Sequence, residues 1–372
     1  MLQDNVQVGT LRQNLRQAVI GGQIKVGQRL DSERDLAARY GIPRTTVSHV
    51  VSGLVEEGLL ARQAGRAGTI VISNHPTRLR SGARQISCLM THFRHWSPSD
   101  NYFYDLIRGA QYAAKEAGFS LNLWSPPDNA SLKEALGEAL EMCGGLVIVD
   151  EEFEDGVAAY LQEHFVRPII LNRPSNLAVD AVLADNVSGI GQVMDYLYKL
   201  GHRRIGYVGN PNDPNNQERE RTFIDLSTRM GLNQVGHVLR MDVNSRKLAQ
   251  VGLKSEEIAL LEESKLTDAF LRTNTAIIGS NDYVSKGVLQ KAKQMRINVP
   301  RDLSVVGFGS FALADQLDPK LTSVRIESDQ IGRHAVRLFL DRLRDTGDRA
   351  AVVERIPVEL HVRESCARAP ER

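Results

Sequence analysis

Residues 32–55, SERDLAARYGIPRTTVSHVVSGLV, decide the fold of the N-terminal part of the chain. Ser32 can cap a helix, and Asp35, three residues later, can reach back to it in a capping-box arrangement. This helix breaks after about Tyr40 at Gly41-Ile42-Pro43, where the proline suits the first turn of another helix. The stretch therefore predicts two helices joined by a tight turn.

The second of these helices has one apolar face and one polar face. Apolar residues recur at helical spacing and predict a buried stripe of Val47, Val50, Val51, Leu54 and Val55. The opposite face then presents Arg44, Thr45, Thr46, Ser48, His49 and Ser52. This combination is typical of a helix-turn-helix, whose second helix lies in the major groove of DNA.

The flanking segments extend this unit. A β-hairpin is predicted next, with its strands and turn at 59–63, 69–72 and 64–68. It would form a wing that carries Arg62 and Arg66. Residues 5–21 predict an earlier helix, which Gly21-Gly22 ends. We therefore expect a winged helix-turn-helix domain over residues 1–73.

A polar linker and a change of charge follow this domain. Residues 74–84 contain proline, glycine and three arginines and show no apolar period, so we expect a linker. Residues 1–84 hold twelve Lys and Arg against six Asp and Glu, whereas the whole chain holds 46 against 45. A basic head on an acidic body suits contact with a polyanion at one end. Chance clustering of charge on a solvated face is the alternative.

Residues 85–372 alternate short apolar runs with helical patterns, which predicts parallel sheets flanked by helices. The expected strands are 86–90, 145–149, 168–171, 181–184, 205–208, 276–278 and 304–307. The expected helices include 105–118, 187–201, 219–230 and 283–295. Because this length exceeds one ordinary sheet, we expect an α/β body of two lobes. Small molecules bind at the carboxyl ends of such strands, in the cleft between lobes.

Composition narrows the class further. The 372 residues are 42% hydrophobic and 24% charged, which are globular values. No apolar run approaches the roughly 20 residues that cross a bilayer, so no membrane partner is expected. The N-terminus shows no secretory signal, and Cys88, Cys143 and Cys366 have neither metal-ligand spacing nor an even count. These features favour the cytoplasm.

Four blocks of the N-terminal part resemble the winged-helix DNA-binding domain of the GntR family. They are GQRLDSERDLA at 27–37, YGIPRTTV at 40–47, LVEEGLL at 54–60 and GRAGT at 65–69. The resemblance implies contacts with double-stranded operator DNA by Arg34, Arg44, Thr45, Thr46, His49, Arg62, Gly65 and Arg66. In it, Arg34 and Arg44 contact bases or phosphates, and the wing residues place the hairpin. The alternative is that these are solvated surface residues.

The remainder is similar to the ligand-binding body of the LacI family, which has a periplasmic-binding-protein-like fold. The blocks are ADNVSG at 184–189, LGHRRIGYVG at 200–209, AIIGSND at 276–282, VPRDLSVVGF at 299–308 and LTSV at 321–324. A GntR head on a LacI-like body is the layout of the AraR-type, arabinose-responsive repressors. The resemblance implies a ligand-responsive transcriptional regulator that acts as a homodimer on a pseudo-palindromic operator.

The same resemblance implies a ligand site for a polyhydroxylated molecule. Its residues would be Tyr102, Tyr104, Asp150, Asn172, Arg219, Asn281 and Asp282. Alternatives stay open: the tyrosines could belong to the lobe core, Asn281 and Asp282 could cap a helix, and Arg219 could belong to a surface charge cluster. The chain also departs from the family, because Gly309-Ser310 stand where an aspartate usually follows the Val-Val-Gly-Phe strand. A long loop at 92–100 indicates a different or larger ligand.

An enzyme built on two α/β lobes is the rival class. The chain has no Gly-x-Gly-x-x-Gly after a strand, no Walker A, no Gly-x-Ser-x-Gly and no His-Glu-x-x-His. His92 and His95 lack a third ligand at metal spacing, so neither a metal nor a cofactor is expected. We therefore expect a repressor of carbohydrate-utilisation genes. A regulator that answers to a purine or a sugar phosphate, or one that activates transcription, remains the alternative.

Overall fold

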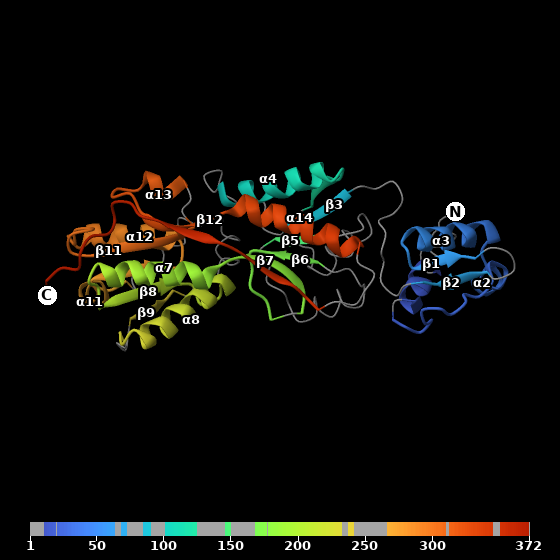
Figure 1. Cartoon of the computed structure of the whole chain (residues 1–372), viewed down its shortest axis with the longest axis horizontal. Helices are drawn as coiled ribbons and strands as arrows, with labels where there is room; N and C mark the ends of the chain where they lie inside the picture. The colour runs from blue at the N-terminus through green and yellow to red at the C-terminus, as the bar shows by residue number, and fades with distance from the viewer. Residues whose placement is uncertain are drawn as a thin grey trace.

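The computed structural model describes twelve segments of the chain. They are residues 11–19, 21–63, 68–72, 85–90, 101–124, 146–149, 168–176, 178–232, 237–241, 266–309, 312–344 and 350–371. Figure 1 shows an N-terminal head, coloured blue, beyond one end of an elongated body.

The head contains three described helices and a two-stranded hairpin. Its elements are the helix at 11–19, α2 (Glu33–Tyr40), α3 (Arg44–Glu56), β1 (Leu60–Arg62) and β2 (Thr69–Val71). Ser32 caps α2 by accepting from the Asp35 amide, as expected. In the expected capping box the Asp35 carboxylate would accept from the backbone N–H of Ser32. In the structure it accepts from the Ser32 hydroxyl. Pro43 lies at the N-cap of α3, one residue before its expected place in the first turn.

The apolar face of α3 forms the centre of the head. Val47, Val50, Val51 and Leu54 are buried among leucines of the neighbouring elements, while Val55 is half-buried. Glu57, just after α3, is buried and accepts hydrogen bonds from Arg12 and Arg16 of the first helix, at 2.5 and 2.9 Å. A buried carboxylate needs such partners, so the two ion pairs hold the first helix against α3.

The body is built on two six-stranded sheets. The first has the order β13-β7-β6-β5-β3-β4, and all its described pairings are parallel. Its strands are β3 (Gln85–Met90), β4 (Ser120–Trp124), β5 (Leu146–Val149), β6 (Ile169–Leu171), β7 (Asp180–Ala184) and β13 (Val353–Ile356). We call the part of the body built on this sheet the first lobe.

The second sheet has the order β14-β12-β11-β10-β8-β9. Its strands are β8 (Ile205–Gly209), β9 (Val238–Arg240), β10 (Ala276–Gly279), β11 (Ser304–Gly309), β12 (Thr322–Ile326) and β14 (Val358–His361). Only the pairing of β14 with β12 is antiparallel. We call this part the second lobe, and its strands β8, β10 and β11 are buried along their whole length because helices cover them.

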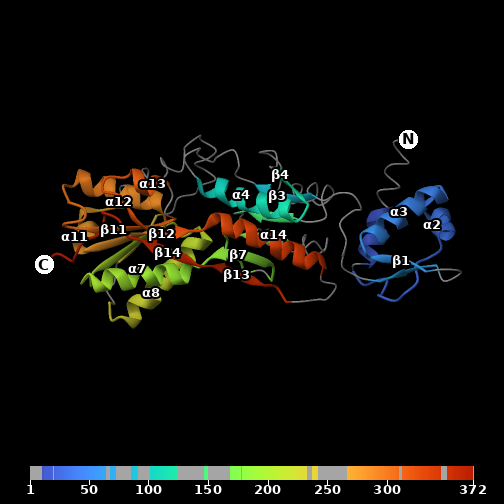
Figure 2. The ribbon, with the colours of Figure 1, turned by 45° about the horizontal axis from the view of Figure 1, so that its top comes forward.

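Helices flank both sheets. They are α4 (Asn101–Glu116), α7 (Asn186–Lys199), α8 (Pro214–Arg229), α11 (Asp268–Thr273), α12 (Asp282–Gln294), α13 (Ala312–Gln316) and α14 (Ser328–Arg344). Figure 2 shows α4 beside α14 on the first lobe. The two helices approach closely because each has a glycine at the contact: a Cβ on Gly109 would lie 1.9 Å from Asp329 O, and one on Gly332 would lie 2.0 Å from Leu106 O.

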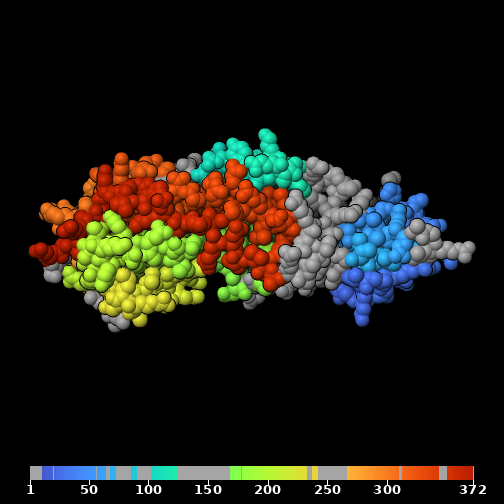
Figure 3. Space-filling view, in the orientation of Figure 1, coloured from blue at the N-terminus to red at the C-terminus, as the bar shows by residue number. Residues whose placement is uncertain are grey.

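Three described segments connect the lobes. Asp185 joins β7 to α7, Glu327 joins β12 to α14, and Pro357 joins β13 to β14. As a result the last elements of the chain belong to both lobes, and Figure 3 shows these orange-to-red elements extending over both. Such connections allow the lobes to close on a ligand as two bodies.

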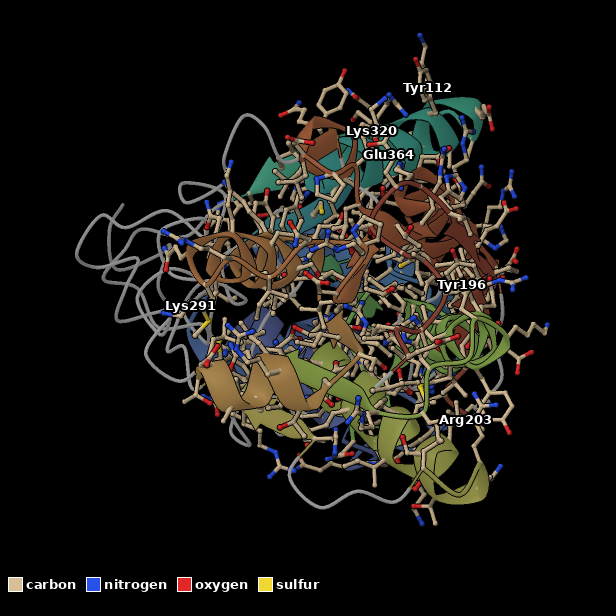
Figure 4. The ribbon with its side chains drawn as sticks, turned by 90° about the vertical axis from the view of Figure 1, so that its left-hand side faces the viewer. Tyr112, Tyr196, Arg203, Lys291, Lys320 and Glu364 are labelled. Carbon is tan, nitrogen blue, oxygen red and sulfur yellow. The ribbon has the colours of Figure 1, made fainter. Side chains whose placement is uncertain are left out.

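The C-terminal residues are fixed to the second lobe. The Ser365 hydroxyl donates to Val305 O at 2.6 Å and accepts from Thr322 N at 2.8 Å. Glu364 N donates to Lys320 O at 3.0 Å, and the two side chains lie next to each other in Figure 4. In the described part of the chain, no helix combines the length and apolar character needed to span a membrane.

Candidate DNA-binding and ligand-binding sites

The polar face of α3 is open on the head. Arg44, Thr45 and His49 are exposed, and Thr46 is half-buried. Arg34 on α2 is largely exposed as well, and among the described residues its ion-pair partner is Asp35, at 3.9 Å. These side chains are therefore free to reach a groove or a phosphate. Gly65 and Arg66 fall outside the described residues.

Arg62 on the wing is held against α3. Its Nη2 atom donates to Ser52 Oγ at 2.8 Å and to Ser48 O at 3.2 Å. The same atom lies 3.3 Å from Oε1 of Glu33, whose other oxygen lies 3.8 Å from Arg44 Nε. Glu33 thus stands between two arginines of the predicted DNA face and aligns the wing with the helix. Sequence spacing did not single out Glu33, because the contact depends on how the hairpin folds back.

The structure places Arg219 of α8 inside the second lobe, only 5% exposed. Its Nε donates to Asn186 Oδ1 at 2.8 Å and its Nη1 donates to Ser280 O at 2.6 Å. The guanidinium also lies 3.7 Å above the ring of Phe308. Burial lowers the pKa of Arg219, while the charges of Asp213 and other neighbours raise it. The alternative of a surface charge cluster is wrong for this residue.

Arg219 keeps donor capacity for a ligand. A guanidinium carries five N–H groups, and among the described residues Nη2 has no acceptor. None of the described carboxylates lies within salt-bridge distance of it. Its neighbours in sequence, Glu218 and Glu220, pair with Arg355 and Arg240 instead. The group is thus a buried, positively charged fork held in a fixed orientation by two neutral acceptors, which suits recognition of ligand oxygens.

Asn172 lies at the end of β6 in the first lobe and faces the second. It is buried, with a φ of 46°, a left-handed conformation that asparagine tolerates. Its Oδ1 accepts from Ala184 N at 3.0 Å, and its backbone oxygen accepts from Asn215 Nδ2 at 2.6 Å. Asn172 is therefore brought near the Arg219 cluster from the opposite lobe.

Tyr102 and Tyr104 differ in their surroundings. Tyr102 is buried in the first turn of α4. It lies near enough to Arg219 to raise the pKa of that arginine. Tyr104 is 64% exposed, with the Arg108 guanidinium 5.6 Å from its ring centre. Residues two apart on a helix point to different sides, so the side that brings Tyr102 toward Arg219 turns Tyr104 away. The expected contact of Tyr104 with a ligand is therefore not supported.

Asn281 and Asp282 follow the end of β10. The Asn281 side chain caps α12 by accepting from Val284 N at 2.9 Å. Asp282 is completely buried and accepts from Ser323 Oγ at 2.5 Å. A Cβ on Gly307 would lie 2.3 Å from the Asp282 carboxylate, which is enclosed between β11 and β12. The capping alternative is thus correct for Asn281, and the expectation that Asp282 contacts ligand is corrected to a role inside the sheet.

Other residues of the cluster were missed by motif reasoning. Asn186, at the start of α7, contacts Arg219, Asn215 and Glu218 through its side chain. Asn186 lies within a block that matched the LacI family, but nothing in its spacing indicated that it meets α8. Asp150 lies outside the described residues. The described residues contain no group of three or more His, Cys, Asp or Glu that could hold a metal.

Two family models match the chain. Residues 7–71 match the bacterial regulatory proteins of the gntR family, and residues 194–366 match a periplasmic binding protein-like domain. The protein joins a GntR-family DNA-binding domain to a periplasmic-binding-protein-like domain. This two-domain architecture is that of a transcriptional regulator.

The similar proteins are named as transcriptional regulators, and the matches cover nearly their whole length. The arabinose metabolism transcriptional repressor of Geobacillus stearothermophilus is 27% identical, over 90% of each chain. The HTH-type transcriptional regulator MalR of Streptomyces coelicolor is 28% identical, over 90% of this chain and 96% of its own. The GntR-type regulator therefore aligns with these proteins through both domains.

Solved structures share the fold. The transcriptional regulator CelR in complex with cellobiose superimposes with a TM-score of 0.65 at 20% identity, covering 90% of this chain and all of its own. The lac repressor dimer bound to operator and an anti-inducer has a TM-score of 0.64 at 16% identity, covering 77% and 95%. Both agree with two α/β lobes in the body of this regulator.

Proposed function

We propose that this regulator represses carbohydrate-utilisation genes and that a sugar or sugar derivative releases it from its operator. The observation that carries the proposal is the buried Arg219 fork, fixed by Asn186 and Ser280 and stacked on Phe308. Sugars present hydroxyl oxygens to such donors. The names of the similar proteins, which include arabinose and cellobiose, point to the same class of ligand.

The DNA-binding part of the proposal rests on the head. Arg34, Arg44, Thr45, Thr46 and His49 would meet the major groove and its phosphates, and Arg62, Gly65 and Arg66 would place the wing. One head is too small to select a single genomic site, so we infer a homodimer on a two-fold operator. We infer that the regulator acts in the cytoplasm, where bacterial DNA lies.

Ligand binding would act on DNA through the lobes. Asn172 reaches the cluster from the first lobe, whereas Arg219 belongs to the second. A sugar between them is bound best when the lobes are closed. Closure then shifts the population away from the arrangement of heads that fits the operator, with a coupling of typically about 1–3 kcal/mol.

The test compares two arginine variants of α8 and its neighbour β9. Arg219→Gln removes the charged fork, and we expect it to bind operator DNA like the wild type but to need at least tenfold more sugar for release. Arg240→Gln breaks the ion pair between this exposed arginine and the buried Glu220 of α8, and it should release normally. Release is followed by fluorescence anisotropy of labelled operator.

The panel for this test contains pentoses, hexoses, sugar acids, disaccharides, sugar phosphates and purines. A carbohydrate that releases the wild type but not Arg219→Gln would support the proposal and identify the ligand class. Release by purines alone would contradict the carbohydrate assignment. Equal release of the wild type and Arg219→Gln would remove Arg219 from the ligand site.

A further inference from the structure

Two side-chain contacts bridge the lobes beside Arg219. Arg355 on β13 of the first lobe donates from Nη2 to Glu218 Oε1 at 2.5 Å and from Nη1 to Glu218 Oε2 at 3.2 Å. Asn215 of α8 donates to Asn172 O of the first lobe at 2.6 Å. Both contacts run between the two sheets, so both depend on how far apart the lobes are.

The bridges meet at Asn186. This side chain is completely buried, and its Oδ1 atom must face Arg219, because a guanidinium can only donate. Its Nδ2 then donates to Asn215 Oδ1 at 3.0 Å and to Glu218 Oε2 at 2.8 Å. Each polar atom of the amide is used, and a flipped amide would bring its NH₂ group against the Arg219 N–H. The orientation of Asn186 is therefore fixed by Arg219 on one side and by both bridges on the other.

Glu218 can serve two donors because it is ionised. Burial acts to raise its pKa, but hydrogen bonds from Arg355 and Asn186 outweigh burial and lower the pKa. An ionised carboxylate only accepts, so it suits the Arg355 guanidinium and the Asn186 amide at once. The contacts form one continuous chain from Arg355 through Glu218 and Asn186 to Arg219.

We propose that Arg355 is a positioning residue for Arg219, acting across the lobes through Glu218 and Asn186. When the lobes are together, the Arg355–Glu218 ion pair holds Asn186 in the orientation that fixes the Arg219 fork. When they separate, Glu218 loses Arg355 and Asn215 loses Asn172 O, so the two groups that hold the Asn186 amide are less constrained. Ligand binding and lobe closure are thereby linked without Arg355 touching the ligand. This inference rests on the proposed role of Arg219 in ligand binding.

The chain offers a matched control on the same helix. Glu220 of α8 accepts from Arg240 Nε and Nη2, at 2.8 and 2.5 Å. This ion pair has the same chemistry as Glu218–Arg355, but both residues belong to the second lobe. Arg240→Gln therefore removes a comparable charge pair while leaving the bridge between the lobes intact.

Hydrogen exchange of the full chain without ligand tests the proposal. In Arg355→Gln we expect exchange to rise about tenfold in peptides covering 184–192 and 214–222, because charge-assisted hydrogen bonds to Glu218 are lost. Arg355→Lys keeps the charge but not both hydrogen bonds, so its exchange should rise less than that of Arg355→Gln. Arg240→Gln should leave these peptides unchanged. Unchanged exchange in Arg355→Gln, or an equal rise in Arg240→Gln, would overturn the proposal.

A second readout separates positioning from general stability. L-arabinose, maltose and cellobiose serve as probes, and in Arg355→Gln the concentration for half-release from operator should rise about tenfold. Operator affinity without sugar and the melting temperature should stay at wild-type values. A half-release concentration that does not change would overturn the proposal. If instead Arg219→Gln releases normally, the ligand site is misassigned, yet the exchange result still reports whether the bridge exists.

Discussion

At the scale of single residues, the head depends on arginines whose charge is held in place and left exposed. Arg44 is exposed at the start of α3, with Glu33 3.8 Å away as its described ion-pair partner. An exposed ion pair of that length contributes little to stability, so Arg44 can exchange Glu33 for a phosphate or a base at small cost. The residue is suited to DNA binding more than to holding the fold.

Arg44→Gln is therefore expected to weaken operator binding by about tenfold or more, since a base or phosphate contact is worth about 1–3 kcal/mol. Sugar binding and the melting temperature should not change. Arg301→Gln, on an exposed arginine of the second lobe paired with Asp302, provides the control. Anisotropy titrations with operator measure both. An operator affinity equal to that of the wild type would exclude Arg44 from the interface.

His202 gives a pH dependence to the second lobe. It is completely buried, with Nδ1 3.0 Å from Thr275 Oγ1 and Nε2 3.1 Å from Ala367 O. Burial lowers its pKa, the hydrogen bond to Ala367 raises it, and the charge of Arg203 at the surface in Figure 4 lowers it again. The net pKa lies below the ordinary 6.5, so the folded protein keeps this ring neutral where the unfolded chain binds a proton.

The stability that His202 contributes is therefore present above about pH 6.5 and is lost as the pH falls through the lowered pKa, because the unfolded state then binds more protons. Melting temperatures of the wild type should fall between pH 7.5 and 5.5. In His202→Gln the fall should be smaller. An identical pH profile for both proteins would contradict a pKa of His202 that folding lowers.

Residue types and motifs predicted Arg219 and Asn172, but not their surroundings. Both were predicted from their match to ligand-contacting positions of a similar family, Asn172 at the end of a strand and Arg219 within a helix. Asn186, Glu218 and Arg355 are 169 residues apart at the extremes of their numbering, and only the crossing of the chain between lobes brings them together. Asp282 misled for a related reason: its carboxylate satisfies Ser323, a residue on another strand.

At the scale of elements, α4 and α14 show how tightly the first lobe is packed. The backbone of each helix lies against a glycine of the other, and the contact leaves no room for a side chain. Close approach of this kind lets the helices bury Leu106 and Ile331 completely. The glycines thus have a packing role that helix propensity alone would oppose.

Gly332→Ala would place a Cβ 2.0 Å from Leu106 O, so we expect a loss of roughly 1–3 kcal/mol in the free energy of unfolding. Gly191→Ala on α7 is the matched control, since nothing lies within 4 Å of its Cβ. That change should stabilise by about 0.5–1 kcal/mol, because alanine favours a helix. Urea unfolding measures both, and similar stabilities of the two variants would refute the tight contact.

The elements themselves were largely predictable from periodicity. Short apolar runs predicted the buried strands, and their limits differ from the observed ones by one or two residues, as at Asp180 and Gln85. Strands such as β13 and β14 were not predicted, because Val353–Ile356 and Val358–His361 alternate with charged residues and belong to two different sheets. Edge strands of this kind gain their identity from the strand they pair with.

At the scale of the whole molecule, DNA and ligand are bound by different domains of one chain. The GntR-type head has its own hydrophobic core around α3, and the body has separate cores. Three described chain segments connect the two lobes of the body. Binding at one site alters the other only if the two prefer different arrangements of the molecule. Coupling between them must then be reciprocal.

The most direct test is a pair of titrations on the full chain, with a DNA site that the protein itself selects from random sequences. Operator affinity is measured with and without the releasing sugar, and sugar affinity with and without operator. We predict that the selected site is two-fold symmetric and that sugar and operator weaken each other by the same factor, between about 5 and 150. An operator affinity that no carbohydrate changes would contradict a sugar-released repressor.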